Sequence, residues 1–143
     1  SSDGYSIEPI PDGMSFKADW KAEIDRWFYP TYTLSAAERQ VCAAADFLEF
    51  DVRAKQDKIE NDFSCQVVYV LYENSGPMSV GYAAPVAEWE RRTIDLTSVR
   101  RSGDTIIGFR LGCNPKGKRL RYEVRDVQLL VEPQPGETQE RGR

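Results

Sequence analysis

The sequence predicts an all-β protein, a two-sheet antiparallel β-sandwich of the jelly-roll type. Three observations support this prediction: apolar and charged residues alternate at 48–53, an apolar run at 65–73 is rich in β-branched and aromatic residues, and turn-forming segments separate the strand candidates. The chain has 143 residues, which suits one domain with a substantial core. Its strands are separated by short turns, and this spacing disfavours a βαβ fold.

The first third of the chain is expected to hold two short strands and a helix. The strand candidates are residues 14–20 and 28–34. Residues 35–45 are rich in alanine, and the segment begins with Ser35, whose hydroxyl suits the N-cap position of a helix. We therefore predict a brief helix at 35–45.

The two strongest strand patterns follow in the middle of the chain. Leu48, Phe50 and Val52 alternate with charged residues, which is the period of a strand that buries one face. Residues 65–73 carry apolar side chains at positions of both parities. A central strand is expected there.

The second half of the chain is expected to form hairpins. The expected segments are a turn at 73–77, strands at 80–82, 91–96, 106–111 and 120–131, and a second turn at 114–118 that joins the last two strands. The tail at 133–143 is polar and contains proline, which is typical of a linker or a disordered end. The folded domain is therefore expected to cover residues 1–132.

Charge and composition disfavour several classes of function. The formal net charge of −4 disfavours nucleic acid as a partner, because a negatively charged protein repels phosphate at long range. No apolar stretch approaches the roughly 20 residues that cross a bilayer, so no membrane span is expected. The opening residues lack a basic head and an apolar signal core, so we interpret the chain as a mature or excised fragment.

The three cysteines do not form a recognisable framework. Cys42, Cys65 and Cys113 are odd in number and show no CxxC spacing, which disfavours a dense disulfide pattern or a zinc site. At most one internal bridge can form between them. Cys65 and Cys113 fall in expected strands, where the preferred interpretation is a small buried hydrophobic side chain.

The sequence offers no strong set of catalytic residues, so we expect a noncatalytic protein. Histidine is absent, which removes Ser-His-Asp and Cys-His mechanisms and histidine-bound zinc. Two carboxylate pairs, Glu49 with Asp51 and Glu60 with Asp62, have the residue type that glycoside hydrolysis uses. The first pair alternates with core residues on one strand and the second lies in a polar segment, so solvated charge is the preferred interpretation of both.

A different set of residues suits the binding of sugar rings. A pyranose ring has an apolar C–H face that packs on aromatic side chains, while its hydroxyls need directed partners. Trp27 and Tyr72 are the candidate platforms, and Arg53 and Arg110 are candidate hydroxyl ligands because a guanidinium carries a fork of donors. Structural alternatives stay open: Trp27 closing the edge of the sandwich, Tyr72 in the core, and Arg53 paired with an acidic neighbour.

Arg110 is the preferred arginine of the two. It interrupts an apolar run, and Gly108 and Gly112 lie at the alternating positions that share its face. The missing side chains of the two glycines are expected to open a groove, since glycine in a strand often marks the close approach of a ligand. The alternative for Arg110 is an ion pair. Gln66 and Tyr82 are further ligand candidates.

Six segments follow one another in an order that is informative as a whole. They are FKADW at 16–20, RWFYPTYTL at 26–34, FDVR at 50–53, YENSG at 72–76, the tryptophan and IDL within 89–96, and YEVRDV at 122–127. Together they cover most of the chain and resemble carbohydrate-binding modules with the galactose-binding-like jelly roll, notably those that bind xylan and glucan. The resemblance implies a concave sheet that presents aromatic and polar side chains to a polysaccharide, with Trp27 and Tyr72 at the stacking positions.

The same resemblance implies a function, partners and a location. It implies a noncatalytic module that binds β-linked plant polysaccharide of the β-glucan or xylan class, secreted or at the cell surface, and that targets an attached glycoside hydrolase to this substrate. It also implies a structural calcium ion, with Glu8 and Asp126 at the matching positions. Two alternatives stay open: a structural β-sandwich domain that packs against a catalytic domain, and a small acid-dependent glycosidase or lyase.

Overall fold

The computed structural model describes residues 4–19, 27, 29–56, 67–82, 87–112 and 119–132. These parts of the chain contain nine strands and one helix. The strands are β1 (Gly4–Ile10), β2 (Gly13–Asp19), β3 (Thr31–Thr33), β4 (Phe47–Gln56), β5 (Val67–Tyr72), β6 (Met78–Tyr82), β7 (Glu90–Asp95), β8 (Ile106–Gly112) and β9 (Arg119–Leu130), and the helix is α1 (Ala36–Ala44). The predicted tail at 133–143 lies outside the described residues.

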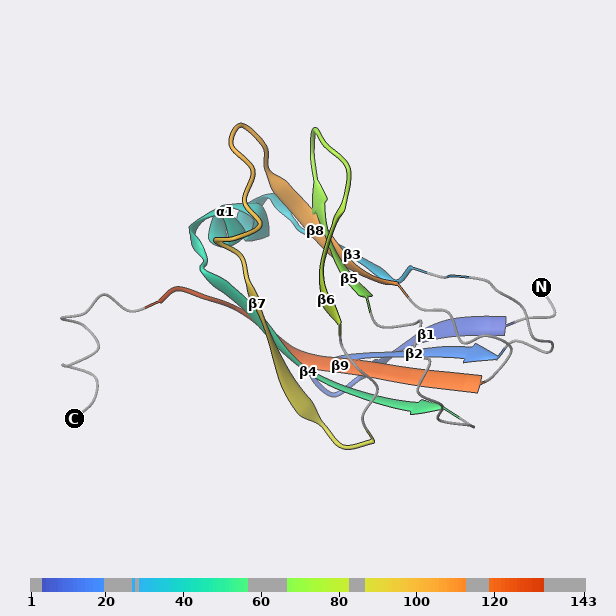
Figure 1. Cartoon of the computed structure of the whole chain (residues 1–143). Helices are drawn as coiled ribbons and strands as arrows, with labels where there is room; N and C mark the ends of the chain where they lie inside the picture. The colour runs from blue at the N-terminus through green and yellow to red at the C-terminus, as the bar shows by residue number, and fades with distance from the viewer. Residues whose placement is uncertain are drawn as a thin grey trace, which may run out of the picture.

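The strands form two sheets, which Figure 1 shows as separate layers. One sheet has five strands in the order β1-β2-β9-β4-β7, and the other has four strands in the order β3-β8-β5-β6. All strand pairings in the described parts are antiparallel. The predicted two-sheet antiparallel β-sandwich is therefore confirmed.

Alternation along β4 explains how the five-stranded sheet covers the core. Leu48, Phe50 and Val52 are buried, and the residues between them project from the opposite, outer face. Strand β9 is the centre of this sheet, because it pairs with β2 on one side and with β4 on the other. The predicted half-buried strand is confirmed at this position.

Strand β5 presents one side of the four-stranded sheet to the same core. Val68, Val70 and Tyr72 are buried and share one parity. Tyr69 lies between Val68 and Val70, so it projects from the outer face, where it is half-buried. The predicted central strand is confirmed, because β5 pairs with β6 on one side and with β8 on the other. Its core side is buried, and its outer side is partly exposed.

The predicted helix is confirmed as α1, which lies at one end of the sandwich near β8 (Figure 1). Ser35 and Glu38 form a capping box, in which Glu38 N donates to the Ser35 hydroxyl at 3.1 Å and Ser35 N donates to the Glu38 carboxylate at 2.8 Å. The second of these bonds lowers the pKa of Glu38. Burial raises the pKa of the Cys42 thiol, which suits a small core side chain. Among the described residues, no helix is long and apolar enough to cross a membrane.

Two features of the topology differ from the predicted one. Residues 106–111 and 120–131 are predicted to form a hairpin, but β8 pairs in the four-stranded sheet and β9 pairs in the five-stranded sheet. Turn-forming residues indicate a chain reversal but do not determine which sheet the next strand joins; the turn at 114–118 itself lies outside the described residues. Strand β1 is not predicted from the sequence, because proline disfavours a strand and β1 contains Pro9. The structure places β1 at a sheet edge, where proline is tolerated.

Candidate functional site

Four aromatic and basic side chains gather on the outer face of the four-stranded sheet. Tyr69 of β5 pairs with Arg110 of β8, and Arg110 pairs with Thr31 of β3. Residues that oppose each other across antiparallel strands project from the same face, so Tyr69 and Arg110 both point away from the core. Trp27 and Tyr29 precede β3 and lie over the same face. We name Trp27, Tyr29, Tyr69 and Arg110 the aromatic face.

The rings of the aromatic face support one another and stay accessible to solvent. The ring centroids of Trp27 and Tyr29 are 6.4 Å apart, and the ring planes differ by 13°. Tyr69 meets Tyr29 edge-on, with centroids 6.2 Å apart and planes at 70°. Trp27 is 36% exposed and Tyr29 is 44% exposed. The rings therefore hold each other in place while part of their surface is available to a ligand.

Arg110 lies between two tyrosines of the aromatic face. Its guanidinium carbon is 4.6 Å from the ring centroid of Tyr29 and 5.0 Å from that of Tyr69, which is within the range of cation–π contact. Its Nε atom is buried and has no hydrogen-bond partner among the described residues. No carboxylate in the described ranges forms an ion pair with it. The alternative of an ion pair for Arg110 therefore finds no support in this part of the chain.

Gly112 brings the rings close to the sheet. A Cβ atom at this position would lie 3.0 Å from Tyr69, 3.3 Å from Trp27 and 3.4 Å from Tyr29. The absence of a side chain thus allows the three rings to pack over the strand. The expectation of an open groove at Gly108 and Gly112 is corrected, because the rings of the protein itself occupy the space over Gly112 and the backbone of β3 approaches Gly108.

Arg53, the other predicted arginine, lies on the opposite side of the molecule. Its neighbours Val52 and Ala54 are buried, so Arg53 projects from the outer face of the five-stranded sheet. Its Nε donates to the Glu123 carboxylate of β9 at 2.6 Å, and its guanidinium lies 4.5 Å from the ring centroid of Trp89. The expectation that Arg53 shares a ligand surface with Trp27 is corrected, and the ion-pair alternative describes this residue.

Arg53 belongs to a wider network on this outer face. Arg91 contacts Glu49 at 3.4 Å and Asp51 at 3.2 Å, and Arg125 contacts Asp51 at 3.3 Å. Burial by itself raises the pKa of Asp51, but the hydrogen bonds and charges of the two arginines outweigh it and lower the pKa overall. We name the following residues the ion-pair face: Glu49, Asp51, Arg53, Trp89, Arg91, Glu123 and Arg125.

Tyr72 belongs to the core and is removed from the stacking candidates. It is only 5% exposed, its hydroxyl donates to the backbone carbonyl of Val99 at 2.5 Å, and burial raises its pKa. The guanidinium of Arg101 covers the ring at 3.9 Å from the centroid. Tyr72 shares the parity of Val68 and Val70, and this parity turns its ring inward.

Two further ligand candidates stay predictions. Gln66 lies outside the described residues. Tyr82 ends β6 and pairs with Val67, but its side chain is also outside the described part of the structure. The positions of these two side chains relative to the aromatic face are therefore not described.

Glu8 and Asp126 do not fit a shared calcium ion. Strand β2 lies between them, because Glu8 pairs with Ser15 and Ser15 pairs with Glu123. From the spacing of strands and of residues along a strand, the Cα atoms of Glu8 and Asp126 are roughly 14 Å apart. Each carboxylate also forms an ion pair: Glu8 with Lys17 at 3.2 Å, and Asp126 with Arg125 at 3.6 Å. Within the described ranges, no group of three or more potential metal ligands occurs.

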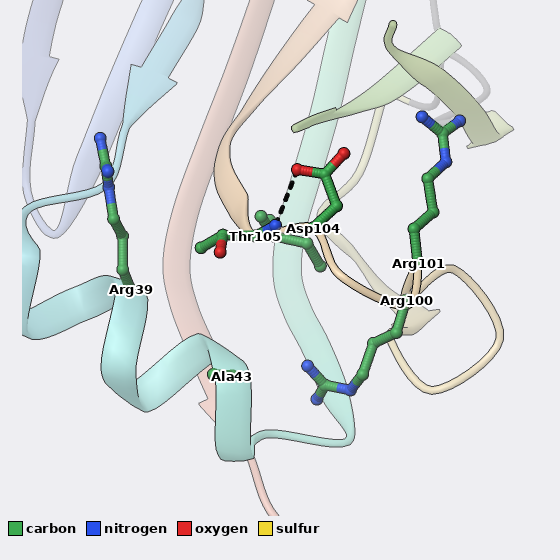
Figure 2. A pocket seen from close by; sticks show the side chains of 7 residues that line it. Arg39, Ala43, Arg100, Arg101, Asp104 and Thr105 are labelled. Atoms are coloured by element: carbon green, nitrogen blue, oxygen red, sulfur yellow. Dashed lines mark hydrogen bonds between the residues drawn. The ribbon is translucent and has the colours of Figure 1, made fainter. Parts of the chain in front are cut away.

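A cavity of about 210 Å³ lies beside α1, but its arginines do not converge on a common point (Figure 2). Arg100 donates to backbone carbonyls at the end of α1, including that of Cys42 at 3.1 Å. Arg101 donates to the Ser75 hydroxyl and to the backbone carbonyl of Gly76, each at 2.7 Å. Arg39 contacts the Glu73 carboxylate at 3.9 Å. These arginines hold the surrounding loops and the helix together, so we assign the cavity a structural role.

Two residues of the aromatic face, Tyr29 and Tyr69, are absent from the ligands expected from the sequence. The signal for Tyr69 is its parity, which is opposite to that of Val68 and Val70 in the same strand. The signal for Tyr29 is its place two positions after Trp27, the spacing at which side chains of a strand share one face. Trp27 and Arg110, by contrast, are expected from the sequence, and the structure places them on one face.

The fold is similar to that of a solved carbohydrate-binding module. The similar structure is the family 11 carbohydrate-binding module of the cellulosomal cellulase Lic26A-Cel5E of Clostridium thermocellum, with a TM-score of 0.57 and 12% sequence identity over 92% of this chain and 84% of that chain. No protein-family model and no curated protein matches the chain. At this level of identity, the likeness shows that the two chains share a β-sandwich fold.

Proposed function

We propose that this chain is a noncatalytic carbohydrate-binding module that binds β-linked plant polysaccharide, of the β-glucan or xylan class, on the aromatic face. The observation that carries the proposal is the arrangement of Trp27 and Tyr29, stacked and exposed, beside Arg110 on the outer side of a regular sheet. The similarity of the fold to a carbohydrate-binding module supports the same class of function.

The chemistry of the aromatic face matches the two kinds of surface that a sugar presents. The indole and phenol rings offer flat apolar area for the C–H face of a pyranose. The guanidinium of Arg110 offers directed donors for groups at the edge of the ring. Because an open face leaves much of the sugar hydrated, we expect micromolar to millimolar affinity, or about −8 to −4 kcal/mol.

The biological role that we propose is targeting. A weak binding module, tethered to a glycoside hydrolase, raises the local concentration of substrate around the catalytic domain. The proposal therefore includes an attached catalytic domain and a secreted or cell-surface location, both of which follow from the resemblance of the sequence to such modules.

The enzyme alternative has little support from the described carboxylates. Glu49 and Asp51 are both held by Arg91 on the ion-pair face. The pKa of Asp51 is lowered, whereas the general acid of a glycosidase needs a raised pKa. Glu60 and Asp62 lie outside the described residues.

A pair of tryptophan variants tests the proposed function. Trp27→Ala removes a stacked ring from the aromatic face, and Trp89→Ala removes a ring of the same size from the ion-pair face. In affinity gel electrophoresis with β-glucan and with xylan, we expect Trp27→Ala to lose most of its retention and Trp89→Ala to keep it, with circular dichroism to verify that both variants are folded.

Three outcomes would overturn the proposal. Wild-type retention of a folded Trp27→Ala variant would mean that the platform lies elsewhere. A glycan array without any binding to the unmodified chain would favour a structural domain that packs against a catalytic neighbour. Release of reducing sugar from xylan or β-glucan would favour an enzyme.

A further inference from the structure

The four-stranded sheet is almost free of charged residues. Its strands have the sequences TYT, VVYVLY, MSVGY and IIGFRLG, in which Arg110 is the only charged residue. The whole chain, by comparison, contains 23 Asp and Glu and 19 Lys and Arg. The positive charge of Arg110 therefore has no acidic partner within its own sheet.

The surroundings of Arg110 orient its charge without neutralising it. The rings of Tyr29 and Tyr69 contact the guanidinium at 4.6 Å and 5.0 Å and restrict its plane. The side chain is half-buried. Its Nε is buried without a hydrogen-bond partner among the described residues, so an incoming acceptor has to reach the guanidinium through its Nη groups. Aromatic contact favours a cation but supplies no anionic acceptor, so an incoming acceptor would gain a charge-assisted bond here.

The arginines of the ion-pair face are arranged differently. Arg53, Arg91 and Arg125 each meet a carboxylate, at 2.6, 3.2 and 3.3 Å respectively. The chain thus pairs its arginines with acids on one face and leaves the arginine of the other face without one in the described residues. A planar carboxylate is the group that best matches the donor fork of a guanidinium, and it adds a Coulomb attraction that a neutral hydroxyl does not offer.

On the basis of the proposed polysaccharide-binding function, we propose that the aromatic face selects β-linked chains that carry uronic acid, and that Arg110 determines this specificity. The rings of Trp27 and Tyr29 take the apolar face of a backbone sugar, and Arg110 binds the carboxylate of an adjacent acidic sugar. The net charge of −4 does not attract an acidic polymer at long range, so this preference depends on the local contact with Arg110.

A matched pair of ligands tests the inference by isothermal titration calorimetry. The first ligand is a xylo-oligosaccharide with a glucuronic acid branch, and the second is the same oligosaccharide after carboxyl reduction, which converts glucuronate into neutral glucose. We expect the unmodified protein to bind the acidic form about tenfold more tightly. Arg110→Gln is expected to bind the two forms with equal affinity, and to bind the neutral form no more tightly than the unmodified protein does, because the variant also loses the donors for neutral hydroxyls. The control Arg53→Gln, on the ion-pair face, is expected to keep the preference.

The possible results separate the inference from the proposed function. Equal binding of both ligands by the unmodified protein would overturn the inference and leave the function intact. Binding of neither ligand at millimolar concentration would overturn both. A folded Arg110→Gln variant that still prefers the acidic form would refute the role of Arg110. If that variant does not fold, Arg110→Lys keeps the charge without the donor fork, and the inference then requires it to show a reduced preference.

Discussion

Arg53 and Arg110 lie on opposite outer faces of the sandwich, and both contact aromatic rings. Arg53 lies 4.5 Å from the ring centroid of Trp89 and donates to Glu123 at 2.6 Å. Arg110 lies 4.6 Å from the ring of Tyr29 and meets no carboxylate in the described parts of the chain. Contact with a ring is therefore common to both faces, and the presence or absence of a counter-charge is what separates an arginine that holds the fold together from one that is available to a ligand.

The largest effect that we expect from breaking this contrast is on stability. Glu123 is buried, with only 9% of its side chain exposed, whereas the Arg53 side chain is 37% exposed. Glu123→Ala leaves Arg53 without its partner, but Arg53 can turn toward water, so we expect a loss of about 1–2 kcal/mol in the free energy of unfolding. Urea denaturation measures this loss.

Two observations accompany the Glu123 variant. Glu123→Gln keeps a hydrogen-bond acceptor for Arg53 and should lose less stability than Glu123→Ala. Retention on β-glucan and xylan gels should be unchanged in both variants. A folded Glu123→Ala protein that no longer binds polysaccharide would place the ligand on the ion-pair face and reverse our assignment of the two faces.

A smaller effect concerns the pH dependence of the ion-pair face. Although burial alone raises the pKa of Asp51, Arg91 and Arg125 lower it below its ordinary value of 3.8. A carboxylate with a lowered pKa in the folded state stabilises the protein above the pKa of the unfolded chain, and this stability is lost as the pH falls through the folded pKa. We expect Asp51→Asn to melt about 2 °C below the unmodified protein at pH 7. The gap should begin to narrow as the pH falls below about 4 and should close only below the lowered pKa of the folded state.

The aromatic face provides the comparison for this pH series. Its strands contain no carboxylate, so binding of the neutral, carboxyl-reduced oligosaccharide should not change over the same range while the protein stays folded. Scanning calorimetry of both proteins from pH 7 to pH 3 measures the gap in melting temperature. A gap that persists unchanged at pH 3 would show that Asp51 acts through something other than its charge.

Much of the fold is predictable from the sequence, because local patterns determine local structure. Alternation predicts which face of β4 is buried, and the serine cap predicts the start of α1. The partners of a strand are a different matter. Strands β8 and β9 are neighbours in sequence, yet their hydrogen bonds lie in different sheets, and this choice depends on contacts between residues far apart in the chain.

The candidate site is predictable to a smaller extent for the same reason. Trp27 and Arg110 have chemistry that suits sugars, and both lie on the aromatic face. Arg53 has the same chemistry, but no local pattern shows that β4 belongs to the other sheet. Tyr72 and Tyr69 differ only in parity, and a strand with apolar residues at both parities hides this difference until the core is known.

The most direct test of the central claim, that the aromatic face and not the ion-pair face binds polysaccharide, is amide chemical-shift mapping. The isotope-labelled chain would be titrated with xylan and β-glucan oligosaccharides. We predict that chemical-shift perturbations concentrate in β5 and β8 around Tyr69 and Arg110, and that the amide chemical shifts of Arg53 and Glu123 do not change. Perturbations centred on β4 and β9, or none at millimolar ligand, would contradict the claim.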